Sequence, residues 1–252
     1  MNEAIKVLDH GIVRLVESMG SDLSIVRNTR VSYEAEWRAG EDEGSDSRLV
    51  NYLMKNHHTK PFESVVFTFE VKAPIFVLRQ WHRHRTWSYN ELSARYRELP
   101  EEFYVPAMEQ ITTQSIDNKQ MRTTEQNPLA GYVAELITAI DVEAFNYYKT
   151  LLASGTPREL ARSVLPVGTY SHMFCTVDLH NLFHFLRLRL HEHAQYEIRV
   201  YAQALLELIE PIVPVAVKAF RKHVLEAPTV DELQRTIRQL EEQLAVEHPN
   251  HA

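Results

Sequence analysis

The sequence contains little glycine and almost no cysteine, and each shortage excludes a class of protein. Seven glycines occur among 252 residues, and none stands in a G-x-G-x-x-G or Walker pattern. A Rossmann or P-loop nucleotide site is therefore not expected, so bound phosphates would be held by arginines and helix N-termini. Cys175 is the single cysteine, which excludes an intrachain disulfide and is typical of proteins in a reducing cytosol.

Long apolar runs and a leader are also lacking. No stretch of the sequence is apolar for long enough to span a bilayer. The first residues, Met1 to Lys6, lack the apolar core of a signal peptide. We therefore expect a cytoplasmic protein. The formal net charge of −7 argues against a broad affinity for nucleic acid.

Hydrophobic patterning predicts one α+β domain with more helix than strand, built on a small mixed or antiparallel sheet and several long helices. In the strongest strand pattern, Val65, Phe67 and Phe69 alternate with mostly polar neighbours. Strands are expected over residues 5–8, 12–16, 64–72 and 167–178. Helices are expected to open at Ser21-Asp22, Asp46-Ser47 and Pro74, and further helices to cover residues 128–154, 178–191, 194–209 and 211–223.

Two features of the pattern concern the surface. Residues 108–127 are polar with little apolar periodicity, so we expect a surface excursion there. The helices predicted at 128–154 and 194–209 have larger apolar faces than a single core needs. A closed symmetric assembly would cover such faces.

The domain is expected to end at residue 222, with a helical extension over residues 223–252. A capping box at residues 229–232 predicts the start of a charged helix that runs to about residue 247. One stripe of that helix is apolar and is expected to dock on a neighbour: Leu233, Ile237, Leu240 and Leu244.

Residues 79–97 form a cationic segment within this acidic chain. The segment contains five arginines and two histidines: Arg79, His82, Arg83, His84, Arg85, Arg95 and Arg97. Local positive charge in an acidic protein favours a small anionic ligand over a polyanion. The planar guanidinium group suits phosphate because it can bind two oxygens at once. On composition alone, a solvated basic turn is an equally good interpretation.

The order of residues in this segment resembles the signature of flavin-dependent thymidylate synthases. Arg83-His84-Arg85 is followed after seven residues by Ser93, and the match continues through residues 88–93 and Arg95-Tyr96. The resemblance covers about residues 1–220. It implies reductive methylation of dUMP to dTMP, with methylenetetrahydrofolate as carbon donor, hydride carried by FAD, and NADPH as reductant. It also implies a homotetramer with flavin sites shared between subunits.

The resemblance assigns a set of residues to dUMP. Arg162 and Arg189 match family arginines that bind the nucleotide, and Arg189 is the expected catalytic residue, because a fixed cation can polarise the uracil ring. Ser93 is expected to bind the nucleotide and not to act as a nucleophile, since no Ser-His-Asp pattern is visible. The expected dUMP residues are Gln80, Arg83, Glu91, Leu92, Ser93, Ala94, Arg95, Arg162 and Arg189.

A second set is assigned to FAD. His58 begins a His-x-x-Pro-Phe-Glu segment that contacts the flavin in the family. Lys60 departs from the small hydroxyl residue common there, which leaves open a main-chain contact or an added charge for the cofactor phosphates. Asp178, His180 and His184 stand where the family often has asparagine or arginine. The expected FAD residues are His58, Lys60, Arg83, His84, Arg85, Glu91, Asp178, His180 and His184.

Two alternatives belong to other classes of protein. One is a metal-dependent hydrolase built on His180 and His184, which have metal-ligand spacing. Arg187 and Arg189 would repel a cation and no carboxylate completes a site, so no metal is expected. The basic segment could also bind RNA, with Trp81, Trp87 and Tyr89 as stacking platforms. Cys175 lies in an apolar strand pattern and is expected to be a core residue.

Overall fold

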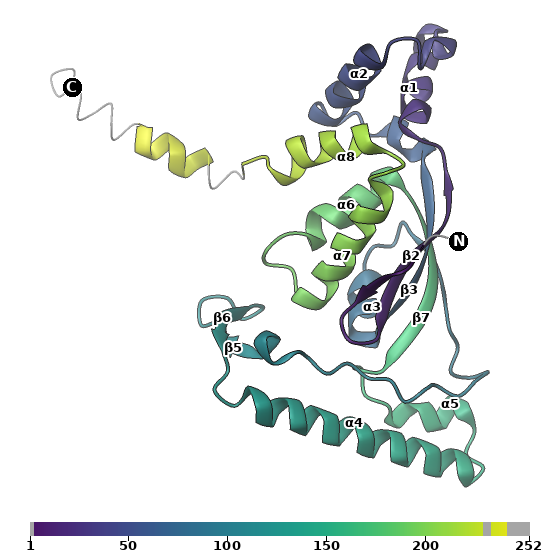
Figure 1. Cartoon of the computed structure of the whole chain (residues 1–252), viewed down its shortest axis with the longest axis vertical. Coiled ribbons are helices and arrows are strands. Elements are labelled where there is room, and N and C mark those ends of the chain that lie inside the picture. The colour runs from purple at the N-terminus through teal and green to yellow at the C-terminus, as the bar shows by residue number, and fades with distance from the viewer. Residues whose placement is uncertain (1–2, 229–232, 241–252) are drawn as a thin grey trace, which may run out of the picture.

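The structure of the protein is a computed structural model that describes residues 3–228 and 233–240 (Figure 1). The main sheet consists of β1 (Ile5–Val7), β2 (Gly11–Met19), β3 (Val66–Pro74), β4 (Ser88–Glu91) and β7 (Tyr170–Asp178). The strands lie in the order β1-β2-β3-β7-β4, and each neighbouring pair is antiparallel. The expected α+β fold is confirmed, with an antiparallel sheet.

The pairing of β3 with β7 forms the centre of the sheet. Phe69 lies opposite Cys175, and both side chains are buried on the core face. One position along, the hydroxyls of Thr68 and Thr176 lie 2.9 Å apart on the other face. The alternation predicted over residues 64–72 is therefore confirmed, since successive side chains point to opposite faces of a strand. Cys175 is a core residue, as its apolar strand pattern predicted.

Helices pack on one face of the sheet and extend beyond its ends (Figure 1). The α-helices are α1 (Asp22–Arg30), α2 (Glu43–Lys55), α3 (Ile75–Trp81), α4 (Ala130–Ala153), α5 (Arg158–Ala161), α6 (Leu179–Arg189), α7 (Tyr196–Ile209) and α8 (Pro214–Phe220). Short 3₁₀ segments span Val31–Tyr33, Glu36–Arg38, Lys60–Ser64, Met108–Gln110 and Arg162–Val164, and a π-helix spans Arg221–Leu225. In the part of the chain described, no helix combines the length and the apolar character that a membrane crossing needs.

Capping side chains set the start of two helices. Asp178 ends β7 and begins α6, because its carboxylate accepts a hydrogen bond from the Asn181 amide at 2.9 Å. Asp42 caps α2 in the same way, with the Ser45 amide at 3.0 Å. The helix therefore starts before Asp46, where the sequence predicted its opening.

Two strand regions are additions to the predicted elements. β4 lies inside the cationic segment, where its Ser-Tyr-Asn-Glu sequence shows no apolar alternation, and it forms because it pairs with β7. The surface excursion predicted at residues 108–127 contains a hairpin of β5 (Thr112–Gln114) and β6 (Arg122–Gln126). Both elements form by pairing with another strand. The hydrophobic periodicity of a single segment does not indicate such pairing.

The two helices expected to have surplus apolar faces differ. α4 leaves Tyr132, Leu136, Ile140 and Tyr147 exposed, and this agrees with the expectation. α7 instead fills the core with apolar residues, so the expectation for residues 194–209 is wrong. Its fully buried members include Ile198, Tyr201, Leu205 and Ile209.

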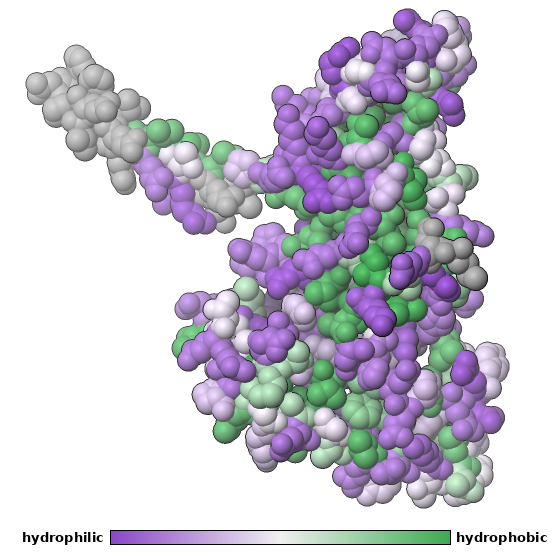
Figure 2. Space-filling model, viewed as in Figure 1, coloured by the Kyte–Doolittle hydropathy of each residue, from purple (hydrophilic) through white to green (hydrophobic). Residues whose placement is uncertain are grey.

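The C-terminal region is described only in part. The capping box predicted at residues 229–232 and the last helix residues from 241 onward, with Leu244, lie outside the described residues. Residues 233–240 are helical and lie apart from the body of the protein (Figure 1). Figure 2 shows hydrophobic and hydrophilic surface on this helix, whose Leu233, Ile237 and Leu240 are exposed. The domain division at residue 222 stays a prediction.

The close approach of β2 to α7 generates a prediction about stability. A Cβ added at Gly11 would lie 2.1 Å from the Tyr201 hydroxyl and 2.5 Å from the Val7 carbonyl oxygen. Gly11→Ala should therefore destabilise the protein by about 1–3 kcal/mol, as overpacking of a core does. Thermal unfolding is the measurement. Gly131→Ala is the matched control, because its nearest neighbour is the end of Met108 at 3.7 Å, and it should not lower stability. An unchanged melting temperature in Gly11→Ala would contradict the prediction.

Candidate functional site

Aromatic packing anchors the cationic segment to the core. Trp81 and Trp87 are buried and lie with their rings 4.8 Å and 5.2 Å from that of Phe185 on α6. Tyr89 donates its hydroxyl hydrogen to the carbonyl oxygens of Trp81 and His84, at 3.0 Å and 2.8 Å. These contacts hold the turn between α3 and β4 against the core. Because Trp81 and Trp87 are buried, they cannot stack on RNA bases as the RNA-binding alternative required.

His84 and Arg189 form a direct contact on the buried side of this turn. The Arg189 Nε donates to His84 Nε2 at 3.1 Å, and Nη2 donates to the Gln80 carbonyl oxygen at 3.3 Å. Burial, with the positive charges of Arg189 and His184, lowers the pKa of His84 to about 4. Near neutral pH the imidazole is therefore uncharged and acts as an acceptor that orients the guanidinium.

A pocket of about 330 Å³, here called the α3 pocket, lies beside α3 and β4. It combines two guanidinium groups with a hydroxyl and a carboxylate, and the Ser171 hydroxyl donates to Glu91 at 2.6 Å. Arginine and serine together suit an anionic oxygen. The residues of its lining that are polar or belong to the cationic segment are Arg79, His82, Glu91, Leu92, Ser93, Ala94, Arg162 and Ser171.

The structure divides the residues expected at dUMP between two places. Glu91, Leu92, Ser93, Ala94 and Arg162 line the α3 pocket. Gln80 and Arg189 lie together elsewhere, at His84. Helical geometry is the reason, because the pocket takes residues 75, 78, 79 and 82 of α3, and position 80 projects from another face.

Two more of the expected dUMP residues lie outside the pocket lining. Arg83 is exposed, and Arg95 forms an ion pair with Glu159 at 3.4 Å. Conversely, Arg79, His82 and Ser171 line the pocket without having been assigned to it. Helical spacing along residues 75–82 is the signal that could have found the first two. Ser171 faces the pocket because of strand pairing, for which the sequence carries no local signal.

A second pocket, of about 230 Å³ and here called the histidine pocket, lies where α6, the end of α2 and α8 meet. Its apolar wall includes Phe62, Phe183 and Phe220, and the last two rings stack with centroids 4.3 Å apart. Arg187 provides a positive charge, and His180 and His184 add imidazole groups to the lining. A flat aromatic surface beside positive charge suits a ring system that carries phosphate.

Two of the nine residues expected at FAD line the histidine pocket. His180 and His184 line it, and the His184 ring lies 5.9 Å from that of His84. Burial is the main cause of a lowered pKa at His184, followed by Arg187 and His180. Arg83 and Arg85 flank His84 and are exposed.

The remaining FAD residues occupy other positions. His58 lies beside Tyr52, with ring centroids 5.8 Å apart, and its neighbours His57 and Thr59 line the pocket instead. Lys60 pairs with Glu63 at 2.8 Å. Asp178 caps α6, and Glu91 lies in the α3 pocket. Sequence reasoning missed Phe220 and Val224 of this pocket, because chain folding alone brings the region after α7 to α6.

Metal ligands do not gather at these histidines. Within residues 3–228 and 233–240, no group of three or more histidine, cysteine, aspartate or glutamate side chains could hold an ion. His180 and His184 therefore lack a third ligand there. The described residues give no support to a metal-dependent hydrolase.

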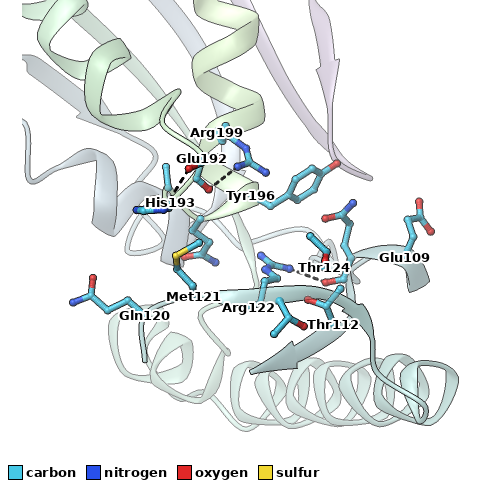
Figure 3. Close-up of a pocket in the computed structure, with 14 residues that line it drawn as sticks. Glu109, Thr112, Gln120, Met121, Arg122, Thr124, Glu192, His193, Tyr196 and Arg199 are labelled. Atoms are coloured by element: carbon cyan, nitrogen blue, oxygen red, sulfur yellow. Dashed lines mark hydrogen bonds and ion pairs between the residues drawn. The ribbon is translucent and has the colours of Figure 1, made fainter. Parts of the chain in front are cut away.

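A third cavity, of about 560 Å³ and here called the hairpin cavity, lies between the β5–β6 hairpin and the start of α7 (Figure 3). Gln195, which lines it, accepts a hydrogen bond from the Gln80 side chain. Through this contact the cavity adjoins the start of the cationic segment. No sequence pattern in the hairpin indicated a functional role.

Comparison with known proteins identifies relatives over most of the chain. The family model described as thymidylate synthase complementing protein matches residues 14–215. The flavin-dependent thymidylate synthase of Treponema denticola is 48% identical over 226 residues, which cover 88% of this chain and 84% of that protein. The enzyme of the same description from Thermus thermophilus is 49% identical over 222 residues, covering 88% and 80%.

Solved structures resemble the fold as well. A structure of the UMP/dUMP methylase PolB from Streptomyces cacaoi bound with 5-Br dUMP superposes with a TM-score of 0.80 at 38% identity. The match covers 89% of this chain and 100% of that one. A second structure of that protein, bound with 5-Br UMP, gives a TM-score of 0.78 at 37% identity, covering 89% and 99%.

The contact between His84 and Arg189 generates a prediction about pH. The pKa of His84 is lowered from 6.5 to about 4 on folding. Between these two values the unfolded chain binds a proton at His84 and the folded chain does not. The free energy of unfolding should therefore decrease as pH falls from 6.5 to about 4. NMR titration of the His84 ring should show a pKa near 4.

Two variants test the cause of this shift. Arg189→Gln removes a nearby positive charge, so the pKa of His84 should rise toward its ordinary value while burial still holds it below. Arg27→Gln, on α1, removes a charge that is not among the causes of the shift and should leave the titration unchanged. Titration of His84 at its ordinary value in the unmodified protein would contradict the assignment of a neutral acceptor.

Proposed function

Because the chain belongs to the flavin-dependent thymidylate synthase family, we propose that it converts dUMP to dTMP with methylenetetrahydrofolate, FAD and NADPH. The folate is the carbon donor, FAD delivers the hydride, and NADPH reduces the flavin. The observation that carries the proposal is the α3 pocket, where Arg79, Arg162 and Ser93 surround a space suited to an anionic nucleotide group. It is formed by the segment on which the family resemblance rests.

The α3 pocket is the proposed site for dUMP. Two arginines match the charge of a nucleotide phosphate, and Ser93 adds a hydroxyl donor. Glu91 is held by Ser171 and can accept hydrogen bonds from a sugar or a base. The UMP/dUMP methylase PolB binds 5-Br dUMP and 5-Br UMP in its solved structures.

The histidine pocket is the proposed site for part of FAD. The stacked rings of Phe183 and Phe220 fit a flat heteroaromatic ring. Arg187 can neutralise phosphate charge, and His180 and His184 can donate hydrogen bonds to phosphate oxygens. Arg83 and Arg85 extend this positive surface next to His84. When bound, FAD supplies the hydride of the reaction.

Arg189 is the proposed catalytic residue, because the protein offers no cysteine nucleophile. Cys175 is buried in the sheet, and burial raises the pKa of its thiol, so a thiolate is not available to attack the uracil ring. Arg189 is already oriented by His84 and by the Gln80 carbonyl oxygen. A cation held in this way can stabilise negative charge on the uracil carbonyl region without reorganising during reaction.

The division of the dUMP residues favours a site completed by a second copy of the chain. Glu91 to Ala94 and Arg162 face one side of α3, while Gln80 and Arg189 face another. One protomer therefore does not gather the whole set in one pocket. The exposed apolar face of α4 supplies surface for assembly. We propose a homotetramer in which protomers share these sites.

The function is tested by the colour and the product of the purified protein. Bound FAD should give absorption near about 450 nm, as oxidised flavins do. With dUMP, methylenetetrahydrofolate and NADPH, the protein should form dTMP, which chromatography detects. A protein that remains colourless with added FAD and yields no dTMP would overturn the proposal.

A substitution tests the role of Arg189. Arg189→Lys keeps the charge but loses the planar fork that contacts both His84 and Gln80, so turnover should fall by about 10²-fold or more. Flavin reoxidation in a single turnover with dUMP and methylenetetrahydrofolate is the measurement, at equal flavin content. Arg27→Lys serves as the control for a surface arginine. A wild-type rate in Arg189→Lys would remove Arg189 from the chemistry.

A further inference from the structure

The hairpin cavity is the largest of the three cavities described above, and the proposed roles of the other two leave it without a ligand. Figure 3 shows Tyr196 and Arg199 on α7 above Arg122 and Thr112 of the hairpin. The cavity has about 560 Å³, within the range of small-molecule sites. Met121 and Tyr196 contribute apolar surface to an otherwise polar lining.

One wall of the cavity is held rigidly. Glu197 is buried and accepts hydrogen bonds from Arg122 at 2.5 Å and from the Tyr104 hydroxyl at 3.1 Å. Arg122 also donates to the Gln110 carbonyl oxygen at 2.7 Å. The charge of Arg122 is therefore matched by Glu197, and these contacts attach the hairpin to α7. The cavity is a built feature and not a gap beside a loose loop.

Two polar groups of the lining have hydrogen-bonding capacity to spare. Arg199 donates through Nη1 to the Glu192 carbonyl oxygen at 2.8 Å, and among the described residues its Nε and Nη2 have no acceptor. The Thr112 hydroxyl oxygen is buried and has no partner within residues 3–228 and 233–240. A buried hydroxyl without a partner costs stability, so it points to a group that a ligand would supply.

The chemistry of these groups selects a carboxylate. The free edge of one guanidinium can bind two oxygens of one carboxylate, and a threonine hydroxyl can donate to the same group. Glu192 and Glu109 also belong to the lining, so the cavity carries charges of both signs. Tyr196 and Met121 offer contact to an aromatic ring next to the carboxylate.

We propose that the hairpin cavity binds the aminobenzoyl-glutamate end of methylenetetrahydrofolate, with Arg199 and Thr112 at a glutamate carboxylate. The inference rests on the proposed function, which supplies a ligand with an aromatic ring and carboxylates at one end. The Gln195–Gln80 contact places the cavity next to the residue whose carbonyl oxygen holds Arg189.

Direct binding to the flavin-loaded protein tests the inference. The probes are N-(4-aminobenzoyl)-L-glutamate and 4-aminobenzamide, which lacks both carboxylates, each titrated by calorimetry. The first should bind and the second should not. Arg199→Gln should weaken binding of the glutamate probe by about tenfold to hundredfold, because a charge-assisted hydrogen bond is lost. Arg27→Gln, an arginine outside the lining, should bind the probe as the unmodified protein does.

Thr112→Val keeps the size of the side chain and removes its hydroxyl. The variant should fold with equal or higher stability, since the hydroxyl has no partner in the described residues, and should bind the glutamate probe more weakly. In steady-state assays, Arg199→Gln should raise the KM for methylenetetrahydrofolate with the KM for dUMP unchanged. A merely structural role for Arg199 would not separate these two constants.

The outcomes distinguish this inference from the proposed function. If the unmodified protein forms dTMP but Arg199→Gln keeps its affinity for the glutamate probe, the inference fails alone. Equal weakening in Arg27→Gln would also overturn it. If no dTMP forms, the proposed function fails. A carboxylate site in the hairpin cavity would still be supported if the unmodified protein binds the glutamate probe selectively and Arg199→Gln does not.

Discussion

The packing of Phe185 against Trp81 and Trp87 is the contact on which the candidate site depends. It attaches the cationic segment to α6, so a stretch rich in arginine takes one conformation despite its internal repulsion. Buried aromatic pairs are stabilised by about 0.5–1.5 kcal/mol beyond the area they bury. The same packing brings His84 under Arg189, because His84 lies 4.8 Å from the Phe185 ring. The position of this histidine follows from the hydrophobic packing, and its lowered pKa follows from burial and from the charges of Arg189 and His184.

The three cavities differ in chemistry. The α3 pocket is arginine-rich and suits a phosphate, while the histidine pocket joins an aromatic wall to a cationic side. Most residues that line the hairpin cavity are polar, and the buried carboxylate of Glu197 pairs with Arg122. The α3 pocket is lined by residues of α3, and the hairpin cavity contacts the same helix through the Gln195–Gln80 hydrogen bond. That arrangement suits an enzyme that must hold several ligands near one another.

Elements with strong internal periodicity were predictable, and elements made by pairing were not. The alternation of Phe67, Phe69 and Val71 predicted β3 because each side chain's face is set by its position in the strand. β4 and the β5–β6 hairpin have little apolar signal and form through their partners. The apolar face of α7 was misjudged as surplus, since amphipathicity does not say whether the covering surface belongs to the same chain or to another.

The sequence by itself determined the chemistry available to this protein: an arginine-rich segment, a single cysteine in an apolar strand, and no glycine loop for phosphates. Its order of residues also determined the family. Only the tertiary structure decided which of these side chains meet. It placed Arg162 with Ser93, separated Arg189 from both, and left the Thr112 hydroxyl without a partner in the described residues. The physical reason is that such contacts join segments far apart in the chain, and their geometry depends on packing that no local pattern encodes.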